Sequence, residues 1–399
     1  MSVTRKPPKF IAIDFFCGAG GTTCGLMDAG GYVVAGIDHD QRCKDTYEKN
    51  NKNKTGDKAN ASFLCFDIFP KSKMHPNGQQ KELMNELRSR ISLIKSLYPT
   101  LPMLFAICAP CQPFTTVSKK ELTAKRKQKR AQDQDLLKQA LKFVAEFSPE
   151  FVLSENVSGI SSDRFGGVWQ RFENGLHRLG YATGSDIVCA SNFGIPQYRK
   201  RSILLGAKDQ KLPESLMADR SSRKLRVPTA DPKSRKKCVK DAIGWLPPLE
   251  AGCEHPSIAN HKTRSLSDLN KKRISVAVPG ETNKYLDNTI FGDLSLNCHR
   301  KVNKKLGVRC FNDVYTRMRG DQPSPTITTK CHSISNGRFG HFDTKQTRGI
   351  SLREAALLQS FPKTYVFYPT DKITHVAIMI GNAVPPRLAK FFASYLVNP

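Results

Sequence analysis

The chain has 399 residues, 39% of them hydrophobic and 9% aromatic, so it can bury more than one core and is not a disordered polypeptide. Its 63 Lys and Arg against 35 Asp and Glu give a formal net charge of +28, which favours a polyanionic partner, above all nucleic acid. No apolar run approaches the roughly 20 residues of a membrane span and no signal-like leader opens the sequence, which predicts a soluble, intracellular protein without a membrane partner.

Two alternatives to a nucleic-acid partner stay open at this point, a basic face turned to solvent and an acidic membrane surface. The 12 cysteines are scattered, and several lie in apolar, strand-like runs, among them Cys65, Cys108 and Cys189. We therefore expect reduced thiols that pack as small apolar side chains, without structural disulfides.

Between residues 10 and 206, short apolar runs alternate with amphipathic stretches whose apolar residues recur at spacings of three and four. This alternation predicts an α/β fold with a parallel, doubly wound sheet that helices cover on both faces. The expected strands are Phe10–Phe16, Tyr32–Asp38, Phe63–Asp67, Leu104–Cys108, Phe151–Ser154 and Ser202–Ala207, and the expected helices are Gln80–Leu97, Asp135–Phe147 and Val168–Leu179.

After residue 207 this rhythm is lost, which predicts a second, smaller domain. The expected division is 1–206 for the catalytic and cofactor-binding domain, 207–344 for the second domain, and 345–399 for a C-terminal segment that returns to the first domain. Helices are expected again at Ser351–Ser360 and Ala383–Leu396. Ser351 is a candidate N-cap, and Glu354 three residues later completes a capping box.

The first strand runs directly into Phe16-Cys17-Gly18-Ala19-Gly20-Gly21, ahead of a helix that begins near Thr22. Glycines at 18, 20 and 21 allow a sharp turn and close approach of a ligand. The N-terminus of the following helix favours an anionic group, either a phosphate or the carboxylate of a methionine moiety. The structural alternative is a turn that only packs the helix against the sheet.

Three polar residues after the next strands fit the same site. Asp38 ends the second strand about 20 residues after the turn, where carboxylates in such folds bind ribose hydroxyls. Asp67 ends the third strand and suits an exocyclic amine, and His39 is a candidate contact to adenine or else a surface histidine. The glycine spacing differs from Gly-x-Gly-x-x-Gly, which favours adenosine with a compact methionine tail over NAD.

The strand Leu104–Cys108 leads into Ala109-Pro110-Cys111-Gln112-Pro113, a loop that two prolines stiffen. Cys111 is therefore expected at the carboxyl end of a parallel strand, where open α/β sheets bind ligands. Its thiol, with an ordinary pKa of about 8.5, would need activation to act as a nucleophile.

Cys108 and Cys111 also form a Cys-x-x-Cys pair, which leaves thiol redox chemistry or half of a zinc site as alternatives. Zinc would need a second pair, and neither Cys298-His299 nor Cys331-His332 is an obvious match. A redox protein would explain neither the glycine turn nor the charge, so we predict no metal.

Glu155 follows the strand Phe151–Ser154 and is expected at the same sheet edge as Cys111. Arg199 and Arg201 precede the next apolar strand at a spacing of two, which places them on one face, where they could clamp a carboxylate or phosphate. The plainer alternatives are an exposed acid and a solvated basic turn.

Five short motifs, taken together in their order, resemble the signature of the DNA (cytosine-5) methyltransferases, and the resemblance spans residues 10 to 390. Two departures, Ala109 before Pro110 and Thr115 in place of serine, do not touch the chemistry directly. The motifs are Asp14-Phe-Phe-Cys-Gly-Ala-Gly-Gly21, Pro110-Cys111-Gln112, Glu155-Asn156-Val157, Gln197-Tyr-Arg-Lys-Arg201 and Gly381-Asn382-Ala383-Val384-Pro385.

The resemblance implies that Cys111 adds to C6 of a cytosine flipped out of duplex DNA, and that Glu155 contacts N3 and the exocyclic amine. Arg199 and Arg201 then help to hold the base and the catalytic carboxylate. The implied methyl donor is S-adenosylmethionine. Its implied contacts are Phe16, Gly18, Gly20, Gly21, Asp38, Asp67, Asn382 and Val384.

The same resemblance makes 207–344 the target-recognition domain, closing with Arg319 and Pro325-Thr326-Ile327-Thr328. It also makes the basic run Ser118–Arg130 a mobile loop that closes over DNA, although a nuclear-localisation-like run or a solvated loop would have similar charge. The DNA sequence recognised cannot be read from the second domain, because Lys and Arg are too numerous there.

Two other functions are compatible with these residues. One is a tRNA (cytosine-5) methyltransferase of the same superfamily, against which the large second domain argues. The other is a non-catalytic nucleic-acid-binding protein, against which the joint presence of Cys111, Glu155, Arg199 and Arg201 argues. We expect a monomer that acts on double-stranded DNA, with a separately encoded restriction endonuclease as a candidate partner.

Overall fold

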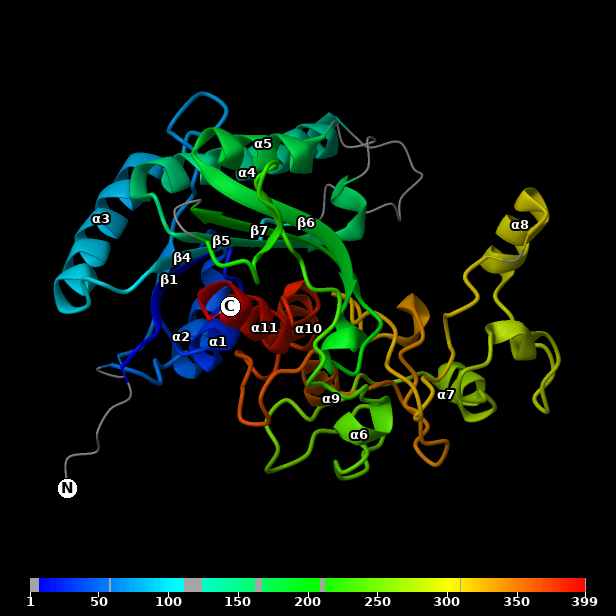
Figure 1. Ribbon diagram of the computed structural model, residues 1–399. Helices are drawn as coiled ribbons and strands as arrows, with labels where there is room; N and C mark the ends of the chain where they lie inside the picture. Colours follow the sequence, from blue (N-terminus) through cyan, green and yellow to red (C-terminus); the bar gives the residue numbers. More distant parts are fainter. Residues whose placement is uncertain are drawn as a thin grey trace, which may run out of the picture. The chain divides into compact units, whose positions relative to one another are not determined.

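Apolar runs rich in β-branched and aromatic residues form a mixed β-sheet (Figure 1). In the part of the chain that the structure describes, this sheet has nine strands in the order β3-β2-β1-β4-β5-β7-β6-β9-β8. The strands are β1 (Phe10–Phe15), β2 (Gly31–Asp38), β3 (Ser62–Cys65), β4 (Met103–Ile107), β5 (Phe151–Val157), β6 (Tyr181–Cys189), β7 (Lys200–Lys208), β8 (Met217–Asp219) and β9 (Lys224–Leu225).

The computed structural model describes residues 7–56, 59–110, 124–161, 167–208, 212–308 and 310–398, and in 124–134 it describes only the backbone. The chain divides into two compact units. Unit 1 comprises Met1–Phe193, Lys200–Lys233 and Val384–Pro399, and unit 2 comprises Gly194–Arg199 and Ser234–Ala383.

The sheet belongs to unit 1, and its strand directions differ in part from the expected parallel arrangement. The strands from β3 through β2, β1 and β4 to β5 are parallel, as predicted. The prediction is wrong for β7, which runs antiparallel to both β5 and β6. The chain returns from β6 to β7 without a helical crossover, and a short return of this kind joins antiparallel strands.

Helices cover both faces of this sheet (Figure 1). On one face lie α3 (Gln80–Leu97), α4 (Ala124–Phe147) and α5 (Val168–Arg178), which bury apolar residues at helical spacing against the strands, for example Leu83 and Leu87 of α3. On the other face lie α1 (Gly21–Asp28), α2 (Lys44–Asn50) and α11 (Pro386–Val397). The doubly wound arrangement is therefore confirmed.

Helix α11 packs closely against α1, although the two are at opposite ends of the sequence. A Cβ atom on Gly25 of α1 would lie 2.3 Å from the carbonyl oxygen of Pro386 and 2.7 Å from Cβ of Ala389. A glycine is required at position 25 because any side chain would push the two helices apart.

Unit 2 is built from short helices joined by irregular segments. Its apolar core includes Ile274, Leu286, Val314 and Ile334. The helices are α6 (Val239–Ile243), α7 (Asp268–Ser275), α8 (Asn297–Leu306), α9 (Leu352–Leu358) and α10 (Ile373–Asn382). Short 3-10 turns occur in the two units at Gln41–Cys43, Ser158–Ser161, Ala190–Phe193, Asn283–Asp287 and Ile334–Asn336.

Buried arginines stabilise the irregular backbone of unit 2. Arg317 has no exposed surface and donates hydrogen bonds to the carbonyl oxygens of Ile274 at 3.1 Å, His341 at 2.8 Å and Gln346 at 2.9 Å. Since backbone outside helices and strands has few internal partners, a buried guanidinium with five N–H donors can satisfy several carbonyl groups at once.

The predicted capping box at the start of α9 is confirmed. Ser351 Oγ accepts a hydrogen bond from Glu354 N at 3.1 Å, and Glu354 Oε2 accepts one from Ser351 N at 2.6 Å. The predicted helix Ala383–Leu396 begins later than expected, at Pro386, because Pro385 has an extended backbone and precedes a second proline that opens α11.

Candidate active site

The connection between β1 and α1 is a tight turn built on left-handed backbone conformations. Phe16, Gly18 and Gly20 have φ values of 62°, 49° and 88°. This conformation is readily adopted by glycine and is unfavourable for phenylalanine. A Cβ atom on Gly18 would meet no atom within 4 Å, so the turn leaves open space on that side. Space beside such a backbone is what close approach of a ligand requires.

Asp38 fixes this turn from the end of β2. Its Oδ2 accepts a hydrogen bond from Gly18 N at 2.9 Å, and its Oδ1 accepts one from Asp40 N at 2.9 Å. The exposed His39 has Nδ1 at 3.4 Å from Asp38 Oδ1, a hydrogen-bonding contact that raises the pKa of His39. Each carboxylate oxygen can accept a further hydrogen bond, so Asp38 could hold the turn and a ribose hydroxyl together.

Asp67 and Phe16 lie at the same edge of the sheet as Asp38. Asp67 follows β3 by two residues, is half-buried, and accepts a hydrogen bond on Oδ1 from Phe69 N at 3.1 Å. Because β1, β2 and β3 are neighbours and parallel, their carboxyl ends meet at one edge. The predicted cofactor residues of these three strands are thus brought to one edge.

Asp14, a buried carboxylate that was not among the predicted site residues, lies near the carboxyl end of β1, two residues before Phe16. Its Oδ2 accepts a hydrogen bond from Thr23 Oγ1 at 2.7 Å, and the same hydroxyl lies 3.0 Å from the hydroxyl of Tyr47. Burial raises the pKa of Asp14 to about 7, despite the opposing hydrogen bond from Thr23.

Replacing Asp14 by asparagine should therefore change how stability depends on pH. The folded state binds this proton more tightly than the unfolded state, so its contribution is present at low pH and is lost as the pH rises from about 4 to about 7. A pKa raised from 3.8 to about 7 corresponds to about 4 kcal/mol. The free energy of unfolding, measured with denaturant at pH 5 and pH 8, should therefore be higher for the variant relative to the native protein at pH 8 than at pH 5.

The matched control is Asp135→Asn, which removes an exposed carboxylate from α4. It should follow the pH dependence of the native protein. If Asp14→Asn also followed it within about 1 kcal/mol, Asp14 would have an ordinary pKa in the folded state.

Glu155 and Arg201 form a buried ion pair between β5 and β7. In the antiparallel register Glu155 pairs with Ile203, so Arg201 is its diagonal neighbour on the same face. Arg201 Nε lies 2.8 Å from Glu155 Oε1, and the two side chains are 9% and 11% exposed. The guanidinium therefore fixes the carboxylate at the end of β5.

Two neighbours of Glu155 anchor the start of the predicted nucleophile loop. Ser154 Oγ donates to the carbonyl oxygen of Ile107 at 2.6 Å, and Asn156 Nδ2 donates to that of Ala109 at 3.0 Å. The Glu-Asn-Val motif thus supplies a carboxylate from one residue and an anchor for the loop from the next. Sequence reasoning missed the second role, because it depends on the side-by-side placement of β4 and β5.

Cys111, the predicted nucleophile, lies outside the described residues, as do positions 118–123 of the predicted basic loop. Residues 124–130 of that loop are instead the first turns of α4, so the loop prediction is wrong for them. Lys and Arg are good helix formers, and a basic run by itself does not separate a loop from an exposed helix.

A small cavity in unit 1 lies between helix α1, which follows the glycine turn, and the predicted catalytic residue Glu155. It is lined by Thr22, Cys108, Glu155 and Val384 among others, and with a volume of about 10 Å³ it has room for at most about one water molecule. Burial, together with the charge of Glu155, raises the pKa of Cys108 well above 9.0. Cys108 is therefore a neutral thiol at neutral pH.

Arg199, predicted beside Arg201, belongs to unit 2, and its guanidinium contacts backbone there. It donates to the carbonyl oxygens of Ile327 at 3.0 Å and of Gly381 and Ala383 at 3.3 Å each. Gln197 is fully buried in the same unit and accepts a hydrogen bond from Ile327 N at 2.9 Å. In this structure the motif therefore joins three distant segments of unit 2.

The last predicted motif spans the boundary between the two units. Asn382 ends α10 and is exposed, whereas Val384 is buried in unit 1. A Cβ atom on Gly381 would lie 2.2 Å from Thr329 N, so the end of α10 requires glycine for its close contact with the 328–329 backbone.

Among the described residues there is no group of three or more His, Cys, Asp or Glu side chains that could hold a metal ion. None of the helices in these residues combines the length and the apolar character that crossing a bilayer demands.

A doubly wound sheet, a glycine turn at the carboxyl end of β1 and acidic residues after β2 and β3 define an α/β enzyme of the S-adenosylmethionine-dependent methyltransferase class. The family model of the C-5 cytosine-specific DNA methylases matches residues 10–69 and 83–398, so the chain belongs to that family and is a DNA (cytosine-5) methyltransferase. The sequence resemblance is confirmed.

Two curated relatives are Type II enzymes. The chain is 35% identical to the Type II methylase M.HgiDII of Herpetosiphon aurantiacus, over 96% of this chain and 93% of that protein. It is 27% identical to the Type II methyltransferase M1.HphI of Haemophilus parahaemolyticus, over 97% of this chain and 86% of that protein.

Solved structures support the fold. A prophage-encoded E. coli protein, described as a putative DNA modification methyltransferase, superposes with a TM-score of 0.64 at 20% identity, covering 98% of this chain and 99% of that chain. The Entamoeba histolytica methyltransferase EhMeth superposes with a TM-score of 0.57 at 13% identity, covering 97% and 98%.

Proposed function

We propose that this chain transfers a methyl group from S-adenosylmethionine to C5 of a cytosine in double-stranded DNA, through a transient bond between Cys111 Sγ and C6. The observation that carries the proposal is the buried Glu155–Arg201 pair at the end of β5, next to the residues that anchor the nucleophile loop. Membership of the C-5 cytosine-specific family supports cytosine as the base that this pair would contact.

In the proposed reaction the thiolate of Cys111 adds to C6, which makes C5 nucleophilic. Glu155 contacts N3 and the exocyclic amine and favours protonation at N3 as negative charge develops on the ring. After C5 has been methylated, loss of its proton and expulsion of Cys111 regenerate the enzyme. Arg201 is a positioning residue that fixes the Glu155 carboxylate. The base must leave the duplex first, at a cost of roughly a few kcal/mol.

The residues at the glycine turn fit the methyl donor. When bound, S-adenosylmethionine supplies the methyl group from its sulfonium. The open space at Gly18 would admit the methionine end, Asp38 would hold ribose hydroxyls, and Asp67 would accept from the adenine amine. The other proposed contacts are Phe16, Gly20, Gly21, His39, Asn382 and Val384.

Target recognition is proposed for 207–344, most of which lies in unit 2. Arg319, from the predicted end of this region, is exposed and pairs with Asp321 at 2.8 Å. Arg199 is proposed to act by holding the 327 and 381–383 backbone of unit 2, in addition to any contact with the base. Because two relatives are Type II enzymes, a cognate restriction endonuclease is the proposed partner. The enzyme is proposed to act as a monomer inside the cell, on chromosomal DNA.

Incubation with labelled S-adenosylmethionine should place label in 5-methylcytosine of unmethylated genomic DNA, and Cys111→Ser should abolish this transfer. Serine keeps the size of the side chain, but its hydroxyl is a far weaker nucleophile than a thiolate. The measurement is label in 5-methylcytosine after digestion of the DNA, with purified tRNA as a parallel substrate.

The control is Cys253→Ser, which exchanges an exposed cysteine of unit 2 and should leave the transfer unchanged. Label only in tRNA would reassign the substrate, and label in DNA that survives in Cys111→Ser would exclude the covalent route. Binding of DNA without transfer to either polymer would leave a nucleic-acid-binding protein.

A further inference from the structure

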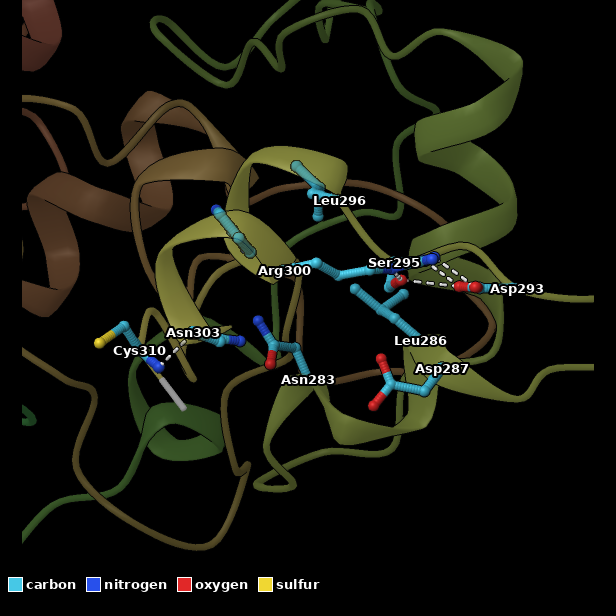
Figure 2. Close-up of a pocket in the computed structure, with 10 residues that line it drawn as sticks. Asn283, Leu286, Asp287, Asp293, Ser295, Leu296, Arg300, Asn303 and Cys310 are labelled. Carbon is cyan, nitrogen blue, oxygen red and sulfur yellow. Dashed lines mark hydrogen bonds and ion pairs between the residues drawn. The ribbon is translucent and has the colours of Figure 1, made fainter. Parts of the chain in front are cut away.

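Helix α8 of unit 2 projects from the rest of that unit without an apolar anchor. None of its ten residues is buried. A pocket of about 400 Å³ lies beneath it, with Arg300 and Asn303 of α8 on one side and Asn283 and Asp287 on another (Figure 2). A helix without a fully buried residue gains little from burial of apolar surface, so its outward face is free to serve another purpose.

Polar contacts on its inner side hold α8 in place. Asn303 Oδ1 accepts a hydrogen bond from Cys310 N at 2.7 Å, and Arg300 pairs with Asp293 while its Nε donates to Ser295 Oγ at 2.6 Å (Figure 2). These contacts fix which face of the helix turns inward.

The outward face carries a continuous exposed stripe. Asn297, Cys298, Lys301, Lys304 and Lys305 are all exposed, and at 3.6 residues per turn they fall within a sector of about 120°. The half-buried residues of the helix, His299, Val302 and Asn303, fall in the remaining sector.

The stripe is strongly basic and unneutralised. Residues 294–312 contain five Lys and Arg and no Asp or Glu. Lys301, Lys304 and Lys305 form no ion pair with any other described residue. The helix dipole favours cations in the last turn, which accounts for Lys304 and Lys305 but not for Lys301. Three lysines on one face instead match a regularly charged polyanion.

We propose that the stripe of Lys301, Lys304 and Lys305 contacts successive phosphates of the DNA backbone, as a sequence-independent anchor of unit 2 on the duplex. Lys301 and Lys305 are separated by about 6 Å along the helix axis. A DNA strand carries one phosphate per about 3.4 Å of its own axis, so the stripe spans about two phosphates. Lysines act there as point charges and carry no base information. The inference rests on the proposed function.

The test compares the native full-length chain with the triple variant Lys301→Gln, Lys304→Gln and Lys305→Gln. The KM for DNA and the Kd for duplex DNA should rise at 150 mM salt, by the same factor for methylatable and non-methylatable sequences. A plot of the logarithm of the association constant for DNA against the logarithm of the salt concentration should become less steep. Its slope should change by about 2 to 3, near 0.9 per lost phosphate contact. The kcat at saturating DNA should be unchanged, because the stripe touches no reacting atom.

Two further variants complete the design. Arginine at the same three positions should retain the native Kd and slope. Glutamine at Lys52, Lys81 and Lys138, three exposed lysines of unit 1, makes the same change of charge and should alter the slope less. Circular dichroism of each variant should match the native protein.

The proposal is overturned if the α8 variant binds DNA with the native slope, or if its loss of affinity equals that of the unit 1 control. It is also overturned if only kcat falls. Absence of methyl transfer by the native chain would count against the proposed function instead, so the two failures are distinguishable.

Discussion

Glu155→Gln should lower kcat/KM for methyl transfer to DNA by about 10² to 10⁴, the range typical for loss of a catalytic acid or base. Glutamine keeps the shape of the side chain opposite Arg201, but it lacks the carboxylate charge and cannot supply a proton to N3 of cytosine. Initial rates at several DNA concentrations measure the loss. Affinity for S-adenosylmethionine, measured by calorimetry, should stay within about twofold, because Glu155 is assigned to the base.

Glu146→Gln is the matched control. Glu146 also pairs with an arginine of unit 1, Arg88, but both side chains are exposed, at 39% and 55%. Such surface pairs contribute roughly 0 to 1 kcal/mol, so activity and stability should be unchanged. A Glu155→Gln enzyme that retained activity within about threefold of native would remove Glu155 from the proton transfer.

Glu354→Ala should lower the free energy of unfolding of unit 2 by about 3 to 5 kcal/mol, since it leaves a buried guanidinium without its counter-charge. Glu354 and Arg348 are both fully buried, with Glu354 Oε1 2.7 Å from Arg348 Nη2 and Oε2 2.8 Å from Nη1. His341 Nε2 lies 3.4 Å from the same carboxylate. Urea unfolding of the full chain, followed by near-ultraviolet circular dichroism, should show an earlier transition.

Glu254→Ala in the same unit is the control, because Glu254 pairs with Lys262 at the surface. This substitution should lower the free energy of unfolding by less than about 1 kcal/mol. A similar cost for Glu354→Ala would mean that the buried network contributes little.

The Glu354 network should also make unit 2 sensitive to acid. Burial alone would raise the pKa of Glu354, but hydrogen bonds from Arg348 and His341 hold it well below its usual 4.5. A depressed pKa contributes stability that is present above pH 4.5 and is lost as the pH falls through the lowered value. The stability gap between native protein and Glu354→Ala should therefore narrow below pH 4.

Sequence patterns located the first five strands well, because buried parallel strands are continuous apolar runs. They missed β6, where Gly184, Ser185 and Asp186 interrupt the apolar residues and only part of the strand is buried. Without β6 the antiparallel return through β7 could not be predicted. Helix α10 was also missed, within a region whose short elements carry weak periodicity.

The meeting of Gly18, Asp38 and Asp67 at one sheet edge was predictable, because the order of the motifs and of the parallel strands brings them together. The partners of Arg199 were not, since the carbonyl groups it contacts are more than 120 residues away in the sequence. The amino-acid composition also counts more positively charged side chains than can contact DNA. Several arginines are buried and hold backbone or carboxylates, namely Arg199, Arg201, Arg273, Arg317, Arg348 and Arg353.

The close packing of Gly25 against α11 has a consequence for synthesis. Helix α1 leaves the ribosome early, whereas α11 follows roughly 360 residues later, which at 5 to 20 residues per second takes about 20 to 70 s. During that time the face of α1 that α11 will cover remains open to chaperones. Unit 1 is therefore completed only after α11 has been synthesised, so an earlier nascent chain has a sheet that is covered on one face only in part.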